Sequence, residues 1–239
     1  MSKFLEIRKV MEYYHSVAIK GIEGGDHFRL DRHQTREYFF IHKMWDEKLH
    51  KYINEELKNK EKLIHLDICG RTNARTMGFH KSYCFALKTS YFRKKMSEDN
   101  HYFFDGDLFN PNDFNEFIEL IKTQKAYPTL ITFEPVAGLQ DYGPEIKIDG
   151  VSNYREIVFA YLVNRLYQIV EILKPGGFLY MERPFQFDSD NAVDFFCRVP
   201  QNKFKISNSL KKVARKLKCK IEIGKEIGGP YFLLRKNII

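Results

Sequence analysis

From residue 62 onward, short apolar runs alternate with stretches whose apolar residues recur every three or four positions. The first run, residues 63–67, is stopped by Cys69-Gly70 and has the length of a buried strand. Further strands are expected at residues 83–87, 101–104, 129–133, 177–181, 219–223 and 231–234. Because parallel strands need a crossover connection, usually a helix, the alternation predicts a mostly parallel sheet between helices.

The helical stretches between these runs have recognisable ends. Asn110-Pro111 offers an N-cap and a first-turn proline for one helix. A second helix is expected over residues 158–173, where Lys174-Pro175-Gly176-Gly177 ends it and turns the chain into the next strand. Ser207 is expected to cap a last helix.

The connection between the final two strands should differ from the other connections. They are joined by Gly228-Gly229-Pro230, a link too short for a crossover helix. The strand over residues 231–234 is therefore predicted to be antiparallel, the only one of seven, and to lie inside the sheet.

Residues 1–60 are predicted to form a helical extension, followed by the main domain over residues 61–239. Two amphipathic helices are expected there, separated by the loop Glu23-Gly24-Gly25-Asp26. The extension carries more aromatic side chains than a solvated helix pair can leave exposed, namely Tyr13, Tyr14, Phe39, Phe40 and Trp45. These side chains must pack either as plain core or as a lid over the strand ends.

Composition excludes several classes of protein. With 44% hydrophobic residues and 14 Gly in 239 residues, the chain is neither disordered nor collagen-like. Its four cysteines form no Cys-x-x-Cys and its histidines no metal-ligand pattern, so a disulfide framework, a zinc knuckle and a metal centre are not expected. No apolar signal segment or membrane span is visible, which predicts a soluble, cytoplasmic protein without a membrane partner.

The net charge of +8 admits a nucleic acid or another anionic partner. Spread over the whole chain, this excess is mild, and solubility explains it more simply. A small molecule is therefore expected as the partner in preference to a nucleic acid.

Three segments together resemble the class I (Rossmann-like) S-adenosylmethionine-dependent methyltransferases. They are residues 63–74 (LIHLDICGRTNA), residues 101–108 (HYFFDGDL) and residues 166–181 (LYQIVEILKPGGFLYM), and residues 229–236 (GPYFLLRK) match the strand that closes such sheets. The resemblance covers most of residues 62–236. It implies a Rossmann-like three-layer sandwich, with a seven-stranded, mostly parallel sheet and an antiparallel last strand.

The same resemblance implies S-adenosylmethionine as the cofactor and a set of residues that hold it. These residues are Asp67, Cys69, Gly70, Asn73, Lys88, Asp107 and Leu108. The methionine end would lie at residues 70–73, with Asp67 orienting that loop, and Asp107 would accept the adenine amino hydrogen. Asp107 has a second interpretation, as a turn or capping carboxylate ahead of the next helix. Lys88 stands where the family has a ribose-binding acid, and it could instead attract a phosphate or simply lie on the surface.

Methyl transfer needs placement of the acceptor and a base for its proton. The segment after the strand at residues 129–133 would face the methyl site. Glu134 is the first candidate for the base or acceptor-orienting group, followed by Asp141 and Tyr142. Glu134 could also serve only to anchor a loop.

Three functions are compatible with these residues. The first is transfer of a methyl group from S-adenosylmethionine to a small molecule or, less readily, a nucleic acid. The second is an NADP-dependent Rossmann enzyme in which Lys88 takes the phosphate. The third is a non-catalytic relative that keeps the fold as a binding scaffold.

Overall fold

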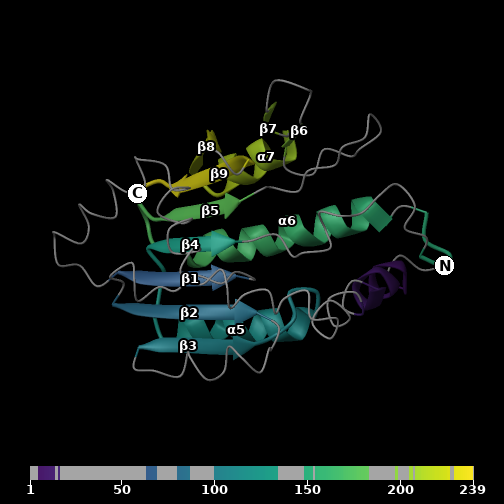
Figure 1. Cartoon of the computed structure of the whole chain (residues 1–239), viewed down its shortest axis with the longest axis horizontal. Helices are drawn as coiled ribbons and strands as arrows, with labels where there is room; N and C mark the ends of the chain where they lie inside the picture. The colour runs from purple at the N-terminus through teal and green to yellow at the C-terminus, as the bar shows by residue number, and fades with distance from the viewer. Residues whose placement is uncertain are drawn as a thin grey trace.

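The centre of the molecule is a seven-stranded sheet. The computed structural model describes residues 5–13, 16, 63–68, 80–86, 100–133, 148–152, 154–182, 197–198, 205–206, 208–226 and 229–238. The strands run in the order β3-β2-β1-β4-β5-β9-β8 (Figure 1). Their bounds are β1 Ile64–Ile68, β2 Lys81–Ala86, β3 His101–Asp105, β4 Leu130–Phe133, β5 Phe178–Glu182, β8 Cys219–Glu226 and β9 Gly229–Lys236.

Strand β9 is antiparallel to both of its neighbours. It pairs with β5 on one side and β8 on the other, while β3, β2, β1, β4 and β5 pair parallel to one another. The predicted Rossmann-like α/β fold, with a mostly parallel sheet and an internal antiparallel last strand, is therefore confirmed.

The predicted turn between β8 and β9 was placed too late in the chain. Gly229 and Pro230 belong to β9, where they pair with Glu226 and Lys225. Proline is tolerated at this point because the pairing of β9 with β5 begins only at Tyr231, so Pro230 has a neighbouring strand on one side only.

Two short strands were not predicted from the sequence patterns. Strands β6 (Cys197–Arg198) and β7 (Lys205–Ile206) form a separate antiparallel pair. Two residues are too few to show the alternation of a strand, so this pair left no periodic signal.

Three helices follow the expected places in the chain. They are α5 (Pro111–Thr123), α6 (Tyr154–Ile172) and α7 (Asn208–Lys216). Asn110 caps α5 as predicted, since its side chain accepts a hydrogen bond from the Asn112 amide. Helix α6 begins four residues earlier than predicted, and Ser207, the predicted cap of α7, lies outside the described residues.

The turn from α6 into β5 depends on two glycines. Gly176 has φ +79°, a left-handed conformation that favours glycine. A Cβ on Gly177 would lie 2.8 Å from the Thr129 carbonyl oxygen and 2.9 Å from that of Lys174. Both contacts are with backbone, so neither can be relieved by a side-chain rotation.

One face of the sheet packs on α5 and α6 and is wholly apolar. Phe85 of β2 stands edge-on to Phe114, with ring centroids 5.3 Å apart, and also contacts Phe117. The core formed with these helices takes every second residue of each central strand, namely Leu66, Ile68, Tyr83, Phe85, Ile131, Phe133, Leu179, Met181 and Leu234. Helices are expected on the opposite face as well, whereas the described helices α5, α6 and α7 all contribute buried residues to the core of the first face.

Residues 5–13 form a helix at the end of the sheet to which the parallel strands point (Figure 1). Val10 and Met11 are buried in the same core as Val151 and Ile157, at the start of α6. The Lys9 ammonium donates to the Asp149 carbonyl oxygen at 3.0 Å. This part of the extension therefore packs as core, and most of residues 1–60 lie outside the described residues.

No helix within the described ranges is both long enough and apolar enough to cross a membrane.

The C-terminal end of α6 is held by a lysine from β9. Lys236 Nζ donates to the carbonyl oxygens of Val170, Glu171 and Leu173, at 3.1, 2.9 and 2.7 Å. The Val170 carbonyl oxygen also accepts the Leu173 amide at 3.2 Å, and the carbonyls of this last turn form the negative end of the helix dipole. Burial lowers the pKa of Lys236, and the three oxygens compensate for part of the lost hydration.

Replacing Lys236 with methionine should therefore destabilise the fold. We expect the free energy of unfolding to fall by about 1–2 kcal/mol, because methionine keeps the apolar stem but removes every donor. Lys212→Met, on the exposed surface of α7, is the control and should stay within about 0.5 kcal/mol of the wild type. Urea unfolding measures both. Equal effects of the two substitutions would contradict the role given to Lys236.

Candidate functional site

The order of the strands creates a switch point between β1 and β4. From β1 the chain adds β2 and β3 on one side, and it then returns to add β4 and β5 on the other. In open α/β sheets, ligands bind outside the carboxyl ends of the strands at such a reversal. Asp67 and Thr132 are directly paired there, one residue before each strand ends.

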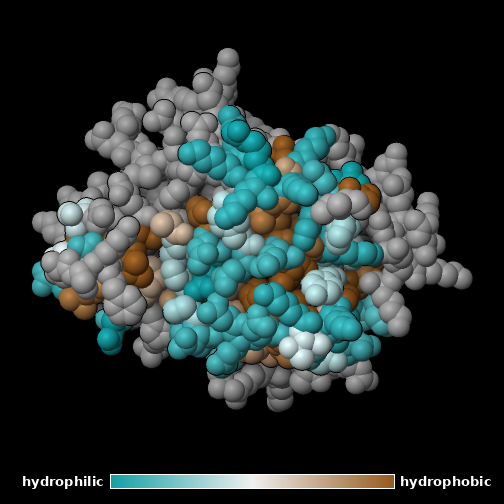
Figure 2. All heavy atoms as spheres, turned by 180° about the vertical axis from the view of Figure 1, so that it is seen from behind, coloured by the Kyte–Doolittle hydropathy of each residue, from teal (hydrophilic) through white to brown (hydrophobic). Residues whose placement is uncertain are grey.

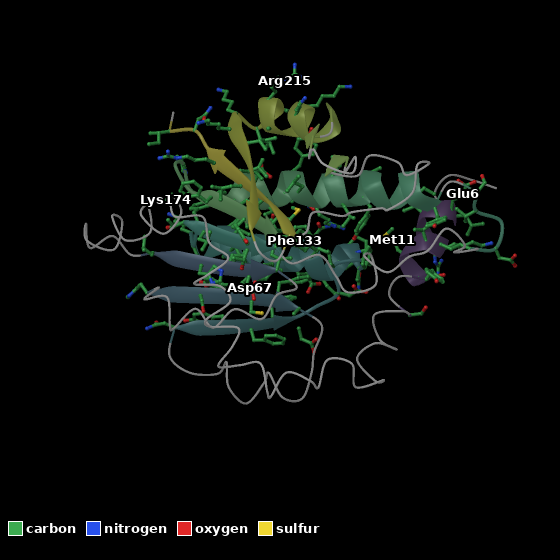
Figure 3. The ribbon with its side chains drawn as sticks, turned by 45° about the horizontal axis from the view of Figure 1, so that its top comes forward. Glu6, Met11, Asp67, Phe133, Lys174 and Arg215 are labelled. Atoms are coloured by element: carbon green, nitrogen blue, oxygen red, sulfur yellow. The ribbon has the colours of Figure 1, made fainter. Side chains whose placement is uncertain are left out.

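A chain of buried hydrogen bonds crosses this point. The Thr132 hydroxyl donates to Asp67 Oδ1 at 2.6 Å, and His65 Nε2 lies 2.8 Å from the same hydroxyl oxygen. A hydroxyl has only one hydrogen, and Asp67 accepts it, so His65 Nε2 carries the proton and donates to Thr132. The exposed fraction of all three side chains is 6% or less. Figure 3 shows Asp67 and Phe133 in the middle of the sheet.

The sheet face that carries this chain of hydrogen bonds is unusually polar. Ser82 and Cys84 of β2 lie on it beside His65 and Asp67, and both are buried. Strands covered on both faces are normally apolar on both. Departures from such a rule concentrate at functional sites. Here the polar residues lie on β1 and β4, which flank the switch point, and on β2 beside β1.

The sequence patterns missed His65 and Thr132 as parts of the site. The available signal was the spacing of His65 and Asp67, since residues two apart in a strand point to one face. Thr132 could not have been identified in that way, because the sequences of β1 and β4 do not by themselves determine the register in which the two strands pair.

The turn after β3 holds Asp107 in a fixed position. Its Oδ1 accepts the Phe109 amide at 2.9 Å, and its own amide donates to Asp113 Oδ2 at 3.0 Å. The Asp107 carbonyl oxygen also accepts the amide of Asn110, the cap of α5. The carboxylate is 2% exposed and serves the turn, as its second interpretation predicts. An ionised carboxylate offers about four acceptor sites, so binding an adenine amino group is compatible with this role.

Gly106 lets this turn approach the core. A Cβ at this position would lie 2.5 Å from the Phe85 ring and 3.2 Å from Cβ of Asp113. The ring of Phe85 is packed between Phe104, Phe114 and Phe117, with centroids 5.0–5.8 Å away. A larger residue would therefore push the turn out of place.

A buried arginine on α6 supports the same turn. Arg165 is 2% exposed, and its Nη2 donates to the Tyr161 hydroxyl at 2.6 Å. That hydroxyl in turn donates to the Leu108 carbonyl oxygen at 2.9 Å. The guanidinium also donates to Gln168 at 2.6 Å and lies 4.9 Å from the centre of the Phe114 ring. Arg165 thus reaches Leu108 through Tyr161 and fixes the turn against α6.

The hydroxyl of Tyr161 stays protonated in this setting. Burial raises its pKa, and the nearby Arg165 guanidinium offsets only part of that rise. Tyr161 can therefore act as a donor to Leu108 and an acceptor from Arg165 at the same time.

Three of the site residues predicted from sequence fall within the described residues. Asp67 lies at the switch point, and Asp107 and Leu108 lie in the turn after β3, all of them buried. The other seven lie outside the described residues, namely Cys69, Gly70, Asn73, Lys88, Glu134, Asp141 and Tyr142. Strands β1 and β4 end at the paired residues Ile68 and Phe133, so the chain leaves two neighbouring strands directly before Cys69 and Glu134.

Among the described residues, no group of three His, Cys, Asp or Glu side chains is arranged to hold a metal ion.

Solved structures of methyltransferases are among those that are similar to this chain. No family model and no curated protein sequence matches the chain. A solved S-adenosylmethionine-dependent methyltransferase from Clostridium acetobutylicum shares 12% identity at a TM-score of 0.46, with 89% of this chain and 98% of that one covered.

Two further solved structures are similar to a comparable extent. CalS10, an amino pentose methyltransferase from Micromonospora echinaspora solved with its cofactor, has 11% identity and a TM-score of 0.45, and the match covers 85% of this chain and 97% of that one. An O-methyltransferase family protein from Burkholderia thailandensis has the same identity and TM-score over 80% of this chain, which spans only 56% of that protein's length.

The hydroxyl of Thr132 should be essential to the buried polar chain. Thr132→Val keeps the shape but leaves His65 and Asp67 without this partner, which should cost about 1–3 kcal/mol of unfolding free energy. Thr132→Ser keeps the hydroxyl and should be more stable than the valine variant by at least about 1 kcal/mol. Denaturant unfolding compares the two. If the valine variant has the same unfolding free energy as the serine variant, the hydroxyl does not stabilise the pairing of β1 with β4.

Proposed function

We propose that this protein transfers a methyl group from S-adenosylmethionine to a small-molecule acceptor. The observation that carries the proposal is the buried polar chain of Asp67, Thr132 and His65 at the switch point of the sheet. A ligand site is expected at this place in an open α/β sheet. The sequence resemblance of residues 63–74 and 101–108 supplies the identity of the ligand.

The described residues suit the two ends of this cofactor. The cofactor has a cationic amino group at its methionine end, and Asp67 is a carboxylate beside the loop proposed to hold that end. The turn at Asp107 presents a carboxylate whose position is fixed by the Phe109 amide and by the support of Tyr161. An acceptor for an exocyclic amino group has to be oriented in this way to discriminate adenine from other rings.

Little further chemistry is required of the protein. The sulfonium of S-adenosylmethionine supplies an already activated methyl group. The protein then has to align the acceptor and remove its proton. We assign the base to Glu134, which follows β4 directly, with Asp141 and Tyr142 as further acceptor-orienting groups. The cofactor loop is proposed to use Cys69, Gly70 and Asn73, and Leu108 to contact the adenine.

Lys88 supports an alternative cofactor. It follows β2 by two residues, where a lysine would attract the phosphate of NADP and could not accept hydrogen bonds from a ribose diol. A non-catalytic scaffold is the other alternative, because Gly70 is the only glycine in the first cofactor loop.

We further infer that residues 1–60 cover the acceptor at the strand ends. Helical residues 5–13 lie at this end of the sheet and pack on the start of α6 (Figure 1). Tyr13 is partly buried against the core, and in the sequence it precedes Tyr14 and the loop predicted at Gly24-Gly25. A cover in this position would exclude water from the transfer step.

Calorimetric titration tests the cofactor directly. S-adenosylmethionine and its demethylated product, S-adenosylhomocysteine, should both bind saturably, and NADP should give no binding heat. Asp107→Asn should weaken both by at least about tenfold, or about 1.4 kcal/mol, because an amide cannot present two acceptor oxygens. Asp105→Asn, on the exposed side of β3, is the matched control and should bind like the wild type.

Other outcomes of the titration separate the alternatives. Binding of NADP alone would replace the proposal with the NADP-dependent enzyme. If none of the three compounds gives heat or shifts the unfolding temperature, the scaffold is the better assignment.

Hydrogen exchange tests the cover without a known acceptor. Saturating S-adenosylhomocysteine should slow backbone amide exchange in residues 5–13, because an occupied site would stabilise the packing of the helix that covers it. Exchange in the second half of α5, which packs away from the strand ends, is the internal control and should not change. A bound product that leaves residues 5–13 unaffected would show that the extension is only structural.

A further inference from the structure

One segment of the chain accounts for the whole net charge. Residues 203–220 contain eight Lys and Arg and no Asp or Glu. The other 31 Lys and Arg (39 − 8) equal the 31 Asp and Glu of the chain in number. The excess of +8 is therefore local, and an explanation from general solubility does not account for its position.

The structure places five of these eight charges on the exposed surface of α7 and the turn after it. The exposed side chains are Lys211, Lys212, Arg215, Lys216 and Lys218. The opposite side of the helix faces the protein, where Ala214 is buried and Leu217 packs against the core. We call the five exposed side chains the basic face.

Among the described residues, no ion pair with a carboxylate neutralises the charges of the basic face. On α5, by comparison, Lys122 is paired with Glu119 at 3.1 Å. The described ion pairs include no carboxylate bound to the basic face, and Lys216 instead lies 4.7 Å from the centre of the Tyr167 ring.

Local helix stability explains only part of this arrangement. Arg215 and Lys216 lie in the last turn of α7, where cations interact favourably with the helix dipole. Lys211 and Lys212 lie in the first half, which has no acidic residue in its first turn. Cations near the positive end of a helix gain nothing from the dipole, so these two require another explanation.

We propose that the basic face binds the phosphate backbone of a double-helical nucleic acid. A helix of nine residues is about 13 Å long, and a duplex carries one charge per roughly 1.7 Å of its axis, so the face reaches several phosphates. Lysine predominates, which suits contacts with phosphate as point charges and not the reading of bases.

Two other anionic partners fit less well. Binding to a membrane surface requires apolar side chains that insert beside the cations, whereas Ala214 of α7 is buried and Leu217, directly after the helix, packs against the core. Single-stranded nucleic acid is usually bound by aromatic side chains on which bases stack. The described part of residues 205–220 contains no aromatic residue.

The basic face lies apart from the switch point. Figure 3 shows Arg215 projecting from the outer rim of the molecule, well away from Asp67. In Figure 2, hydrophilic side chains gather in the upper middle of the rear face, at the height at which Figure 1 places α7. Binding at this face therefore does not depend on the proposed methyl transfer.

Fluorescence anisotropy tests the proposal on the full chain. Labelled duplexes of DNA and of RNA, each of about 20 base pairs, are titrated between about 50 and 200 mM salt. The test variant is K211Q/K212Q/R215Q. The control R8Q/K122Q/K125Q also removes one arginine and two lysines, all from outside the segment. Unfolding temperatures confirm that both variants remain folded.

The test variant should lose at least about tenfold in duplex affinity at intermediate salt, and its salt slope should become shallower by about 2 to 3. The control should bind like the wild type. Equal losses in both variants would overturn the proposal, because binding would then follow net charge alone. It would also be overturned if neither duplex bound at low salt, if a single strand of equal length bound more tightly, or if phosphatidylserine vesicles bound in place of the duplexes.

Discussion

The pairing of β1 with β4 is the contact on which the rest of this structure depends. It joins two strands separated by more than 60 residues and sets the reversal of strand order in the sheet. The pair is buried on both faces, and one face carries the hydrogen bonds of Thr132 with Asp67 and His65. A one-residue slip would move these polar groups into the apolar core with Phe114 and Phe117. The polar chain therefore also specifies the register, which in turn decides which residues leave the sheet side by side.

The second support of the candidate site comes from helix α6, in the layer that packs on the apolar face of the sheet. Arg165 and Tyr161 belong to α6, yet they act on the turn after β3 through the Leu108 carbonyl oxygen. A buried guanidinium is costly unless its donors are used. Here the two Nη groups donate to Tyr161, Gln168 and Asn115, whereas Nε has no hydrogen-bond partner among the described residues. Removal of any one of them would leave a buried charge with fewer partners, so the cluster holds the helix and the turn in one arrangement.

The sequence was sufficient for the order and direction of the main elements and insufficient for their contacts. Strand runs, the Pro111 start of α5 and the glycine turn before β5 are local patterns, and the structure has all of them. The antiparallel direction of β9 was predicted from the short link between β8 and β9. The partners of Asp67 did not follow in this way, because His65 and Thr132 are 67 positions apart and only the register brings them together. Asp107 was identified through the family motif, whereas its role in the turn required the positions of Phe109 and Asp113.

The basic face and the buried site differ in what solvent does to their charges. At physiological ionic strength, exposed charges are screened over about 8 Å, so α7 acts mainly on what touches it. Asp67, Asp107 and Arg165 are buried, where interactions with neighbouring groups are screened much less. An anionic partner on α7 can therefore be gained or lost without altering the electrostatics at Asp67. The physical separation allows the basic face and the buried polar chain to have independent sequence requirements.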